Sequence, residues 1–223
     1  MKKNTMMRVA SALLVAVLLS TCAISGTFAK YITTGGGSDF ARVAKWGVEI
    51  KAESFDLFTD KYETDDTTFE GEYSVKSSDG KDVLAPGTNG TFADIAISGT
   101  PEVAVDVAIV ATVNVSNNWI VDDKFYCPVT VTVGSTAISG LEYDSAAEFA
   151  GAIKEEIDGK SAQYEPNTSL GNTDLELSWA WAFEGAAGGK QTDVKDTALG
   201  DAAADGEELK IEIGVAITAT QID

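Results

Sequence analysis

Acidic side chains are the most frequent residues of this sequence that could do chemistry, and many of them lie in two segments, residues 60–66 and 193–208. Hard cations such as Ca²⁺ prefer several carboxylate or carbonyl oxygens. Weak calcium binding at these acidic segments is therefore one interpretation. The spacing does not match an EF-hand loop, however, and charged side chains are usually solvated at the protein surface. The preferred prediction is that the chain needs no cofactor and no metal ion.

The sequence contains no histidine, the residue on which several common catalytic sites depend. Ser-His-Asp and Cys-His arrangements are excluded, as is the two-histidine helix that binds zinc in many metallopeptidases. Gly189-Lys190 is followed by Gln191 and lacks the upstream glycine spacing of a phosphate-binding loop. The sequence therefore predicts no enzyme, although a site built from carboxylates, or from serine and lysine, would leave no such signature.

Two tryptophans and one cysteine each have a structural and a functional interpretation. Trp179 and Trp181 are two residues apart on a predicted strand, so their side chains share one face, and an exposed pair could stack on a sugar. They continue the row of Leu175 and Leu177, which favours two core residues instead. Cys127 lies at the start of a β-rich stretch and is predicted to be a small buried residue rather than a reactive thiol.

The first 29 residues have the three parts of a cleavable secretion signal. Three basic residues precede an apolar run over residues 9–24, and small residues follow at Thr27 and Ala29. Signal peptidase is predicted to cleave after Ala29, which makes Lys30 the first residue of the mature chain. The run is shorter than the ~20 apolar residues that span a bilayer, so no stable membrane span is expected after cleavage. The alternatives are a retained anchor and lipidation of Cys22.

The charge of the mature chain excludes several classes of partner. The three basic residues of the signal leave with it, so the formal net charge of −19 becomes −22 on the chain that begins at Lys30. Such an acidic chain repels nucleic acid and anionic membrane surfaces. The predicted location is the extracellular matrix or the cell surface. The expected partners are signal peptidase during export and, afterwards, other copies of the chain or other matrix proteins.

Residues 30–40 are predicted to form a flexible amino-terminal arm ahead of a single β-sandwich domain at 41–223. The three glycines at 35–37 have no side chains and are expected to act as a hinge. The arm has apolar side chains at Tyr31, Ile32 and Phe40. Such a segment could add as a strand to an exposed sheet edge, or it could be a disordered tail without a partner.

Alternating apolar and polar residues predict that the domain is all-β. Strands are predicted near residues 46–50, 91–97, 102–113, 129–133, 175–183 and 209–217. One helix is predicted at about 145–157, where Ser145 and Glu148 form a capping box. Residues 184–208 are predicted to be a loop. Short strands separated by turns, with one helix in a connection, indicate an antiparallel β-sandwich.

Three segments carry a resemblance to a known family. They are Gly26-Thr27-Phe28-Ala29 at the signal junction, residues 41–48, and the turn Leu84-Ala85-Pro86-Gly87-Thr88, which together cover less than a third of the chain. They resemble the TasA and camelysin family of Gram-positive secreted proteins, whose signals are cut by the dedicated signal peptidase SipW. The resemblance implies a jelly-roll-like β-sandwich secreted into the biofilm matrix. It also implies that the freed amino terminus adds as a strand to a neighbouring subunit and so builds fibres.

The residues and the resemblance together leave three functions open. The preferred one is a secreted structural protein of the extracellular matrix that assembles through its amino-terminal arm. The alternative is a cell-surface binding module for a glycan or a protein ligand. The third, a camelysin-like metallopeptidase, is the least favoured because no metal or nucleophile motif is visible.

Overall fold

The computed structural model describes residues 12–16, 41–52, 56–63, 70–170, 175–183 and 190–222. Two units are distinguished in the chain, Met1–Arg42 and Val43–Asp223. In the first unit, residues 12–16 are helical. No helix among the described residues is long and apolar enough to cross a membrane. The second unit, called the body below, contains all the strands that the structure describes.

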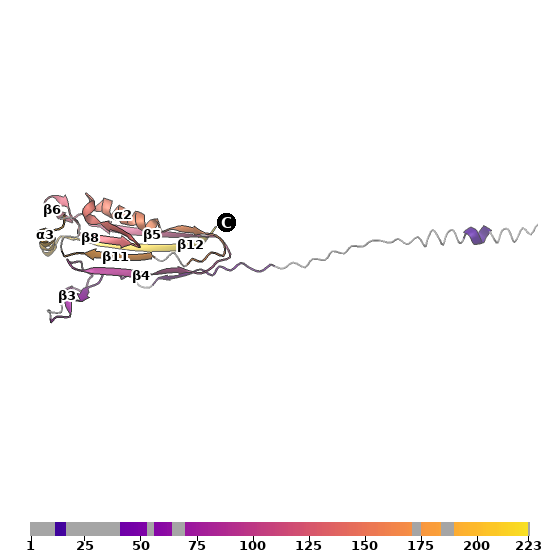
Figure 1. Cartoon of the computed structure of the whole chain (residues 1–223), viewed down its shortest axis with the longest axis horizontal. Helices are drawn as coiled ribbons and strands as arrows, with labels where there is room; N and C mark the ends of the chain where they lie inside the picture. The colour runs from indigo at the N-terminus through magenta and orange to yellow at the C-terminus, as the bar shows by residue number, and fades with distance from the viewer. Residues whose placement is uncertain are drawn as a thin grey trace, which may run out of the picture. The chain divides into compact units, whose positions relative to one another are not determined.

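The body consists mainly of two antiparallel sheets (Figure 1). The larger sheet has the order β1 (Glu49–Ala52), β4 (Asn89–Ser98), β11 (Leu175–Trp181), β8 (Val129–Val133) and β9 (Thr136–Ser139). The smaller has the order β10 (Ala162–Tyr164), β5 (Val105–Val115) and β12 (Ile211–Gln221). Two ribbons pair β2 (Lys61–Glu63) with β3 (Tyr73–Lys76) and β6 (Ile120–Val121) with β7 (Lys124–Phe125). The prediction of a fold built mainly from antiparallel strands is confirmed.

Buried and exposed side chains alternate along the strands, and the buried ones form one core that both sheets share. In β11 every second side chain is buried, and the same holds for β8. Side chains of the two sheets join a single hydrophobic cluster. At one place the packing leaves room only for glycine: the indole N–H of Trp179 donates to the Leu57 carbonyl at 2.8 Å, and a Cβ at Gly90 would lie 2.3 Å from that oxygen.

The predicted strands are confirmed to within a few residues, with one exception at the start of the body. The prediction of a strand at 46–50 is wrong in its first part, because the chain is coil through Val48 and β1 begins at Glu49. The backbone N–H of Lys45 donates to a carboxylate oxygen of Glu102 at 3.0 Å, and the Glu102 N–H donates to the Lys45 carbonyl at 2.9 Å. The segment is therefore held by the loop before β5 instead of a neighbouring strand.

The predicted turn ahead of β4 is confirmed. Gly87 has φ +82°, and the Thr88 N–H donates to the Ala85 carbonyl at 3.1 Å. This is the arrangement of a type II turn, with Pro86 in the second position and positive φ in the third.

The predicted helix at about 145–157 is confirmed as α2 (Ala146–Asp158). Its first turn is capped by Ser145, whose hydroxyl oxygen accepts the Glu148 N–H at 3.2 Å. The side chains that recur every four residues are fully buried, namely Phe149, Ile153 and Ile157. The helix contacts β5 of one sheet and β8 and β9 of the other, and Figure 1 shows it beside β5 and β8. A one-turn 3₁₀ helix, η1 (Gly140–Glu142), precedes it.

The outer edge of β5 is closed by the end of α2 and the residues after it. The Ala111 N–H donates to Asp158 Oδ1 at 2.7 Å. The Ile109 N–H donates to Ser161 Oγ at 2.9 Å, and the Ser161 hydroxyl donates to the Ile109 carbonyl at 3.1 Å. Ile109 and Ala111 are both buried. Their backbone groups are thus satisfied by side chains where another strand would otherwise be needed.

Replacing Asp158 by alanine is expected to lower the free energy of unfolding by about 1–2 kcal/mol at pH 7, because the buried Ala111 N–H loses its acceptor. The ammonium of Lys154, and after it the Ala111 N–H, lower the pKa of the Asp158 carboxyl. A lowered folded-state pKa gives stability above the ordinary aspartate pKa of about 3.9, and this stability is lost as the pH falls through the lowered value.

Urea unfolding of wild type and D158A from pH 7 to pH 3 measures this effect. The difference in free energy of unfolding between wild type and D158A should begin to decrease below about pH 4. Glu155→Ala, which removes an exposed carboxylate from the same helix, is the matched control and should behave as wild type. If this difference stays constant from pH 7 to pH 3, the ionised Asp158 carboxylate does not stabilise the edge of β5.

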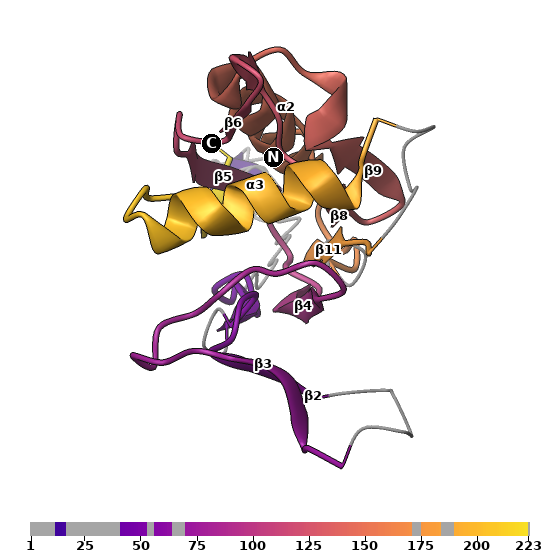
Figure 2. The same ribbon diagram turned by 90° about the vertical axis from the view of Figure 1, so that its left-hand side faces the viewer.

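The prediction of a loop at 184–208 is wrong, because α3 (Asp193–Ala204) lies within it. The body therefore has two α-helices among its described residues, and the prediction of a single one is corrected. Thr192 caps α3 by accepting the Lys195 N–H at 3.4 Å, and Asp193 and Asp196 lie in the first turn, where the helix dipole favours acidic residues. Figures 1 and 2 show α3 lying across one end of the strands.

Candidate functional site at the β12 edge

β12 is the longest edge strand of the body. It pairs with β5 along all of its 11 residues, from Ile211 opposite Val115 to Gln221 opposite Val105. It has no second neighbour among the residues that the structure describes. The other edge strands, β1, β9 and β10, have three or four residues each.

The two ends of this ladder show which backbone groups of β12 face outward. The Ser116 N–H donates to the Lys210 carbonyl at 2.9 Å, and the Ile222 N–H donates to the Ala104 carbonyl at 2.9 Å. In an antiparallel pair, hydrogen-bonded and non-bonded positions alternate, so the even-numbered residues of β12 bond to β5. The N–H and C=O groups of its odd-numbered residues, from Ile211 to Gln221, point away from β5 to the open side.

The same odd-numbered residues carry the inward side chains of β12. Ile211 and Ile213 are buried, at 5% and 8% exposure. Val215, Ile217 and Ala219 pack against the core but are only half-buried. The inward side chains are therefore well shielded at the start of β12 and only partly covered along the rest of the strand. A further strand beside β12 would both pair its backbone and cover these side chains.

β12 also lacks the features that usually protect a sheet edge. Natural edges are shielded by proline, bulges, short length or charged side chains, particularly lysine. The strand has no proline and no register shift, and its one charged residue is Glu212 at the beginning. This unprotected edge is the candidate functional site of the protein.

A cavity of about 600 Å³, called the β12 cavity below, opens at the beginning of this strand. Its walls include Trp119 and Trp181, whose rings lie 5.9 Å apart at 58°. Ile211 and Ile213 line it from β12 itself, and α3 contributes Leu199 among others. Asp82, Lys210 and Glu212 also line it, and the Lys210 ammonium forms an ion pair with the Glu212 carboxylate. The cavity therefore combines an apolar interior with charged residues of both signs.

A buried carboxylate fixes α3 beside this cavity. Asp196 is 5% exposed and accepts three hydrogen bonds. They come from the Tyr126 hydroxyl at 2.6 Å, the Gln191 side-chain amide at 2.8 Å and the Trp181 indole at 3.3 Å. Burial, and after it the hydrogen bond to Asp196, raise the pKa of Tyr126 far above its usual range, so this phenol stays protonated as a donor. The carboxylate thus ties α3 to β11 and to the segment before β8.

Neither Asp196 nor the open side of β12 can be identified from the sequence. The acidic residues of 193–208 predict a solvated loop, whereas Asp196 is a buried residue of a helix. The alternation of β12 was visible, but its place at the edge depends on the order of the strands. No local signal in the sequence gives that order.

The other predicted residues fall into two groups. Thr27, Ala29, Lys30, Tyr31, Ile32 and Phe40 lie outside the described residues, so the cleavage site and the arm stay predictions. The core assignment of Trp179, Trp181 and Cys127 is confirmed, since all three are buried. Burial raises the pKa of the Cys127 thiol to about 12. The described residues include no group of three or more histidine, cysteine or acidic side chains that could hold a metal ion.

No family model, curated protein or solved structure matches this chain.

Proposed function

We propose that the chain is a secreted structural protein of the extracellular matrix, in which the arm of one copy, residues 30–40, adds as a strand to β12 of another. The observation that carries the proposal is the open edge of β12. It offers outward N–H and C=O groups at every second residue and leaves half-buried apolar side chains beside them. Strand addition to such an edge gains affinity from main-chain hydrogen bonds.

The length and residue types of the arm support the same proposal. Residues 30–40 equal the 11 residues of β12 in number, and at about 3.3 Å per residue each spans roughly 36 Å. Ile32 and Phe40 share one face of an extended strand and could supply apolar side chains that cover the exposed part of the core, whereas Tyr31 would point to the other face. Each hydrogen bond formed at the edge would contribute about 1 kcal/mol net. We further propose that the two sheets and the added strand form a sandwich of the jelly-roll type.

Cleavage of the signal would control assembly in this proposal. Before cleavage, the arm is joined to residues 1–29 and its amino end is not free. Cleavage after Ala29 would release it outside the cell, where the edges of other copies are available. Assembly would then be confined to the place where the fibre is needed.

Light scattering coupled to size exclusion tests the proposal on two forms of the protein, one beginning at Lys30 and one at Ala41. The form that begins at Lys30 should assemble with increasing concentration, and the form that begins at Ala41 should remain monomeric at every concentration. If both remain monomeric, strand addition fails, and a binding module for a glycan or protein ligand becomes the better hypothesis. If both assemble equally, the subunits associate without the arm.

A further inference from the structure

We infer that the β12 cavity binds Phe40 of the incoming copy, so that the arm runs antiparallel to β12 and the subunits join head to tail. This inference rests on the proposed strand addition and specifies which residue anchors the strand and in which direction it runs.

The cavity lies where a strand on the open edge would end. Ile211 and Ile213 line the cavity with their side chains, and their backbone groups face the open side of β12. The residue of an added strand that pairs near Ile211 therefore lies beside the cavity. The aromatic and aliphatic side chains there suit a phenyl ring, since rings pack well against indole faces and edges.

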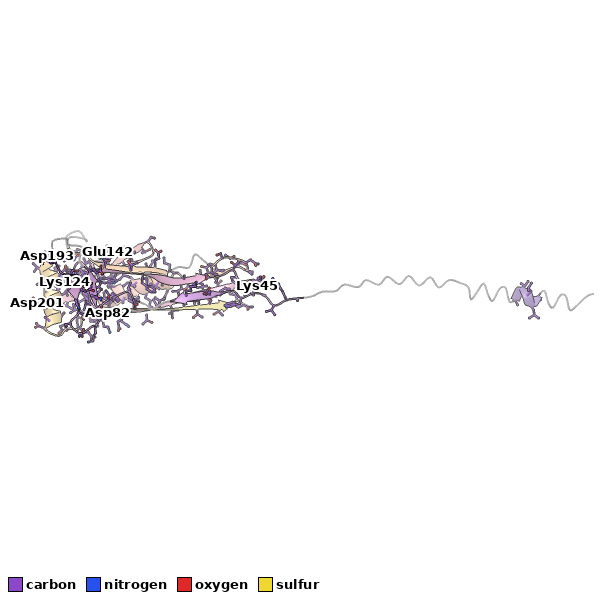
Figure 3. The ribbon with its side chains drawn as sticks, turned by 90° about the horizontal axis from the view of Figure 1, so that it is seen from below. Lys45, Asp82, Lys124, Glu142, Asp193 and Asp201 are labelled. Carbon is purple, nitrogen blue, oxygen red and sulfur yellow. The ribbon has the colours of Figure 1, made fainter. Side chains whose placement is uncertain are left out.

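The chain enters its own body at the other end of β12. Lys45 is hydrogen-bonded to Glu102, and the end of β12 is hydrogen-bonded to Ala104, two residues further on. Figure 3 shows Lys45 at the end of the body opposite to Asp82 and Asp201. The five residues from Phe40 to Lys45 span at most about 18 Å, whereas β12 is roughly 36 Å long. A chain's own Phe40 therefore cannot reach its own β12 cavity.

This geometry separates two modes of strand addition. If an arm folded back along its own β12, it would run parallel to that strand and bring Tyr31 to the cavity. If a second copy lies head to tail beyond the cavity end, its Phe40 arrives first and its arm runs antiparallel. All ladders among the described residues are antiparallel, and antiparallel pairs are slightly more stable per residue. The fold thus favours the second mode.

Charge complementarity points in the same direction. The arm and the segment after it carry Lys30, Arg42 and Lys45 against the single acidic residue Asp39, in a chain whose net charge is otherwise strongly negative. Figure 3 shows Asp82, Glu142, Asp193 and Asp201 together with Lys124 at the end of the body that would receive this segment. The pockets at this end add Lys190, Lys195 and Lys210, and on the acidic side Asp122, Asp123, Asp144, Asp196 and Glu212, so acidic residues outnumber lysines there. Opposite charges at the two ends would steer copies into the head-to-tail orientation.

Two variants of the form that begins at Lys30 test the anchor. Phe40→Ala should raise the protein concentration needed for assembly roughly ten- to hundredfold, because a buried phenyl ring is lost. Val194→Ala, which removes an 80% exposed apolar side chain from α3 outside the cavity, should leave that concentration unchanged. If F40A assembles as wild type does while the form beginning at Ala41 stays monomeric, strand addition stands and the anchor is refuted. If wild type itself stays monomeric, the proposed function fails.

Disulfide trapping tests the direction of the arm. Ala203 is exposed and lines the cavity, so A203C combined with A41C should give a ladder of covalent oligomers on oxidation of the assembled protein. A203C combined with K30C should give none. A crosslinked monomer from the K30C pair, with no ladder from the A41C pair, would show that the arm lies parallel on its own β12 and would overturn the inference. Cys127 is fully buried and does not compete for oxidation.

Discussion

Replacing Ala219 by proline is expected to abolish assembly of the form that begins at Lys30, while the folded subunit loses only about 1 kcal/mol of stability. Ala219 is an odd-numbered residue of β12, so its N–H points to the open side and does not bond to β5. Proline is tolerated in a sheet only where the lost N–H faces outward on an edge strand. Its ring would occupy the space that an added strand needs, and the outward donor would be missing.

Ala216→Pro is the matched control for this prediction. Ala216 is opposite Val110, and as an even-numbered residue it directs its N–H to β5. Proline there removes a hydrogen bond between β12 and β5 and should lower the free energy of unfolding by roughly 3 kcal/mol. Urea unfolding should therefore rank A216P well below A219P, whereas light scattering should show that A219P stays monomeric even though it is folded. If A219P assembles as wild type does, β12 is not the edge that accepts the arm.

A large effect of a side-chain truncation on the stability of the body is expected at Asp196. Asp196→Ala should lower the free energy of unfolding by about 3 kcal/mol, because the donors of Tyr126, Gln191 and Trp181 lose a common buried acceptor. The loss should also release α3, since Asp196 and Leu199 are its two buried residues. Asp196→Asn keeps one acceptor oxygen and should cost less.

Calorimetry or urea unfolding of D196A, D196N and D201A measures this contribution. Asp201 lies exposed on the same helix, so D201A should stay within about 0.5 kcal/mol of wild type. Protection of the α3 amides from hydrogen exchange should fall in D196A more than in D201A. Equal unfolding midpoints for D196A and D201A would contradict the role assigned to this carboxylate.

The strands could be predicted because their side chains alternate strictly between core and solvent. Leu175, Leu177, Trp179 and Trp181 form such a row, and all four are buried. α2 could be predicted because Ser145 caps it and its apolar residues recur on one face. In these elements the local pattern and the tertiary environment agree, which is the condition for a reliable prediction.

α3 could not be predicted in the same way because it buries so little. Its two buried side chains, Asp196 and Leu199, include only one apolar residue, so the sequence has no apolar stripe. Thr192 followed by Asp193 was the available signal for a helix start. The glycine and aspartate residues around it favour a loop, although the alanines of α3 have high helix propensity. The open edge of β12 was beyond sequence analysis for a different reason, since it arises from strands far apart in the chain.

The closure of β5 by α2 has a consequence for the form of any polymer. The side chains of Asp158 and Ser161 form hydrogen bonds with the outer backbone groups of β5. Among the described residues, β12 is therefore the one long edge of the smaller sheet that remains available for pairing. Each subunit would have one arm that adds to a neighbour and one β12 edge that accepts the arm of another neighbour, so it would be a bifunctional monomer. Bifunctional monomers grow into linear, unbranched chains with one donor end and one acceptor end. Under our proposal, filaments would therefore have polarity, and crosslinked networks would need a second protein to join them.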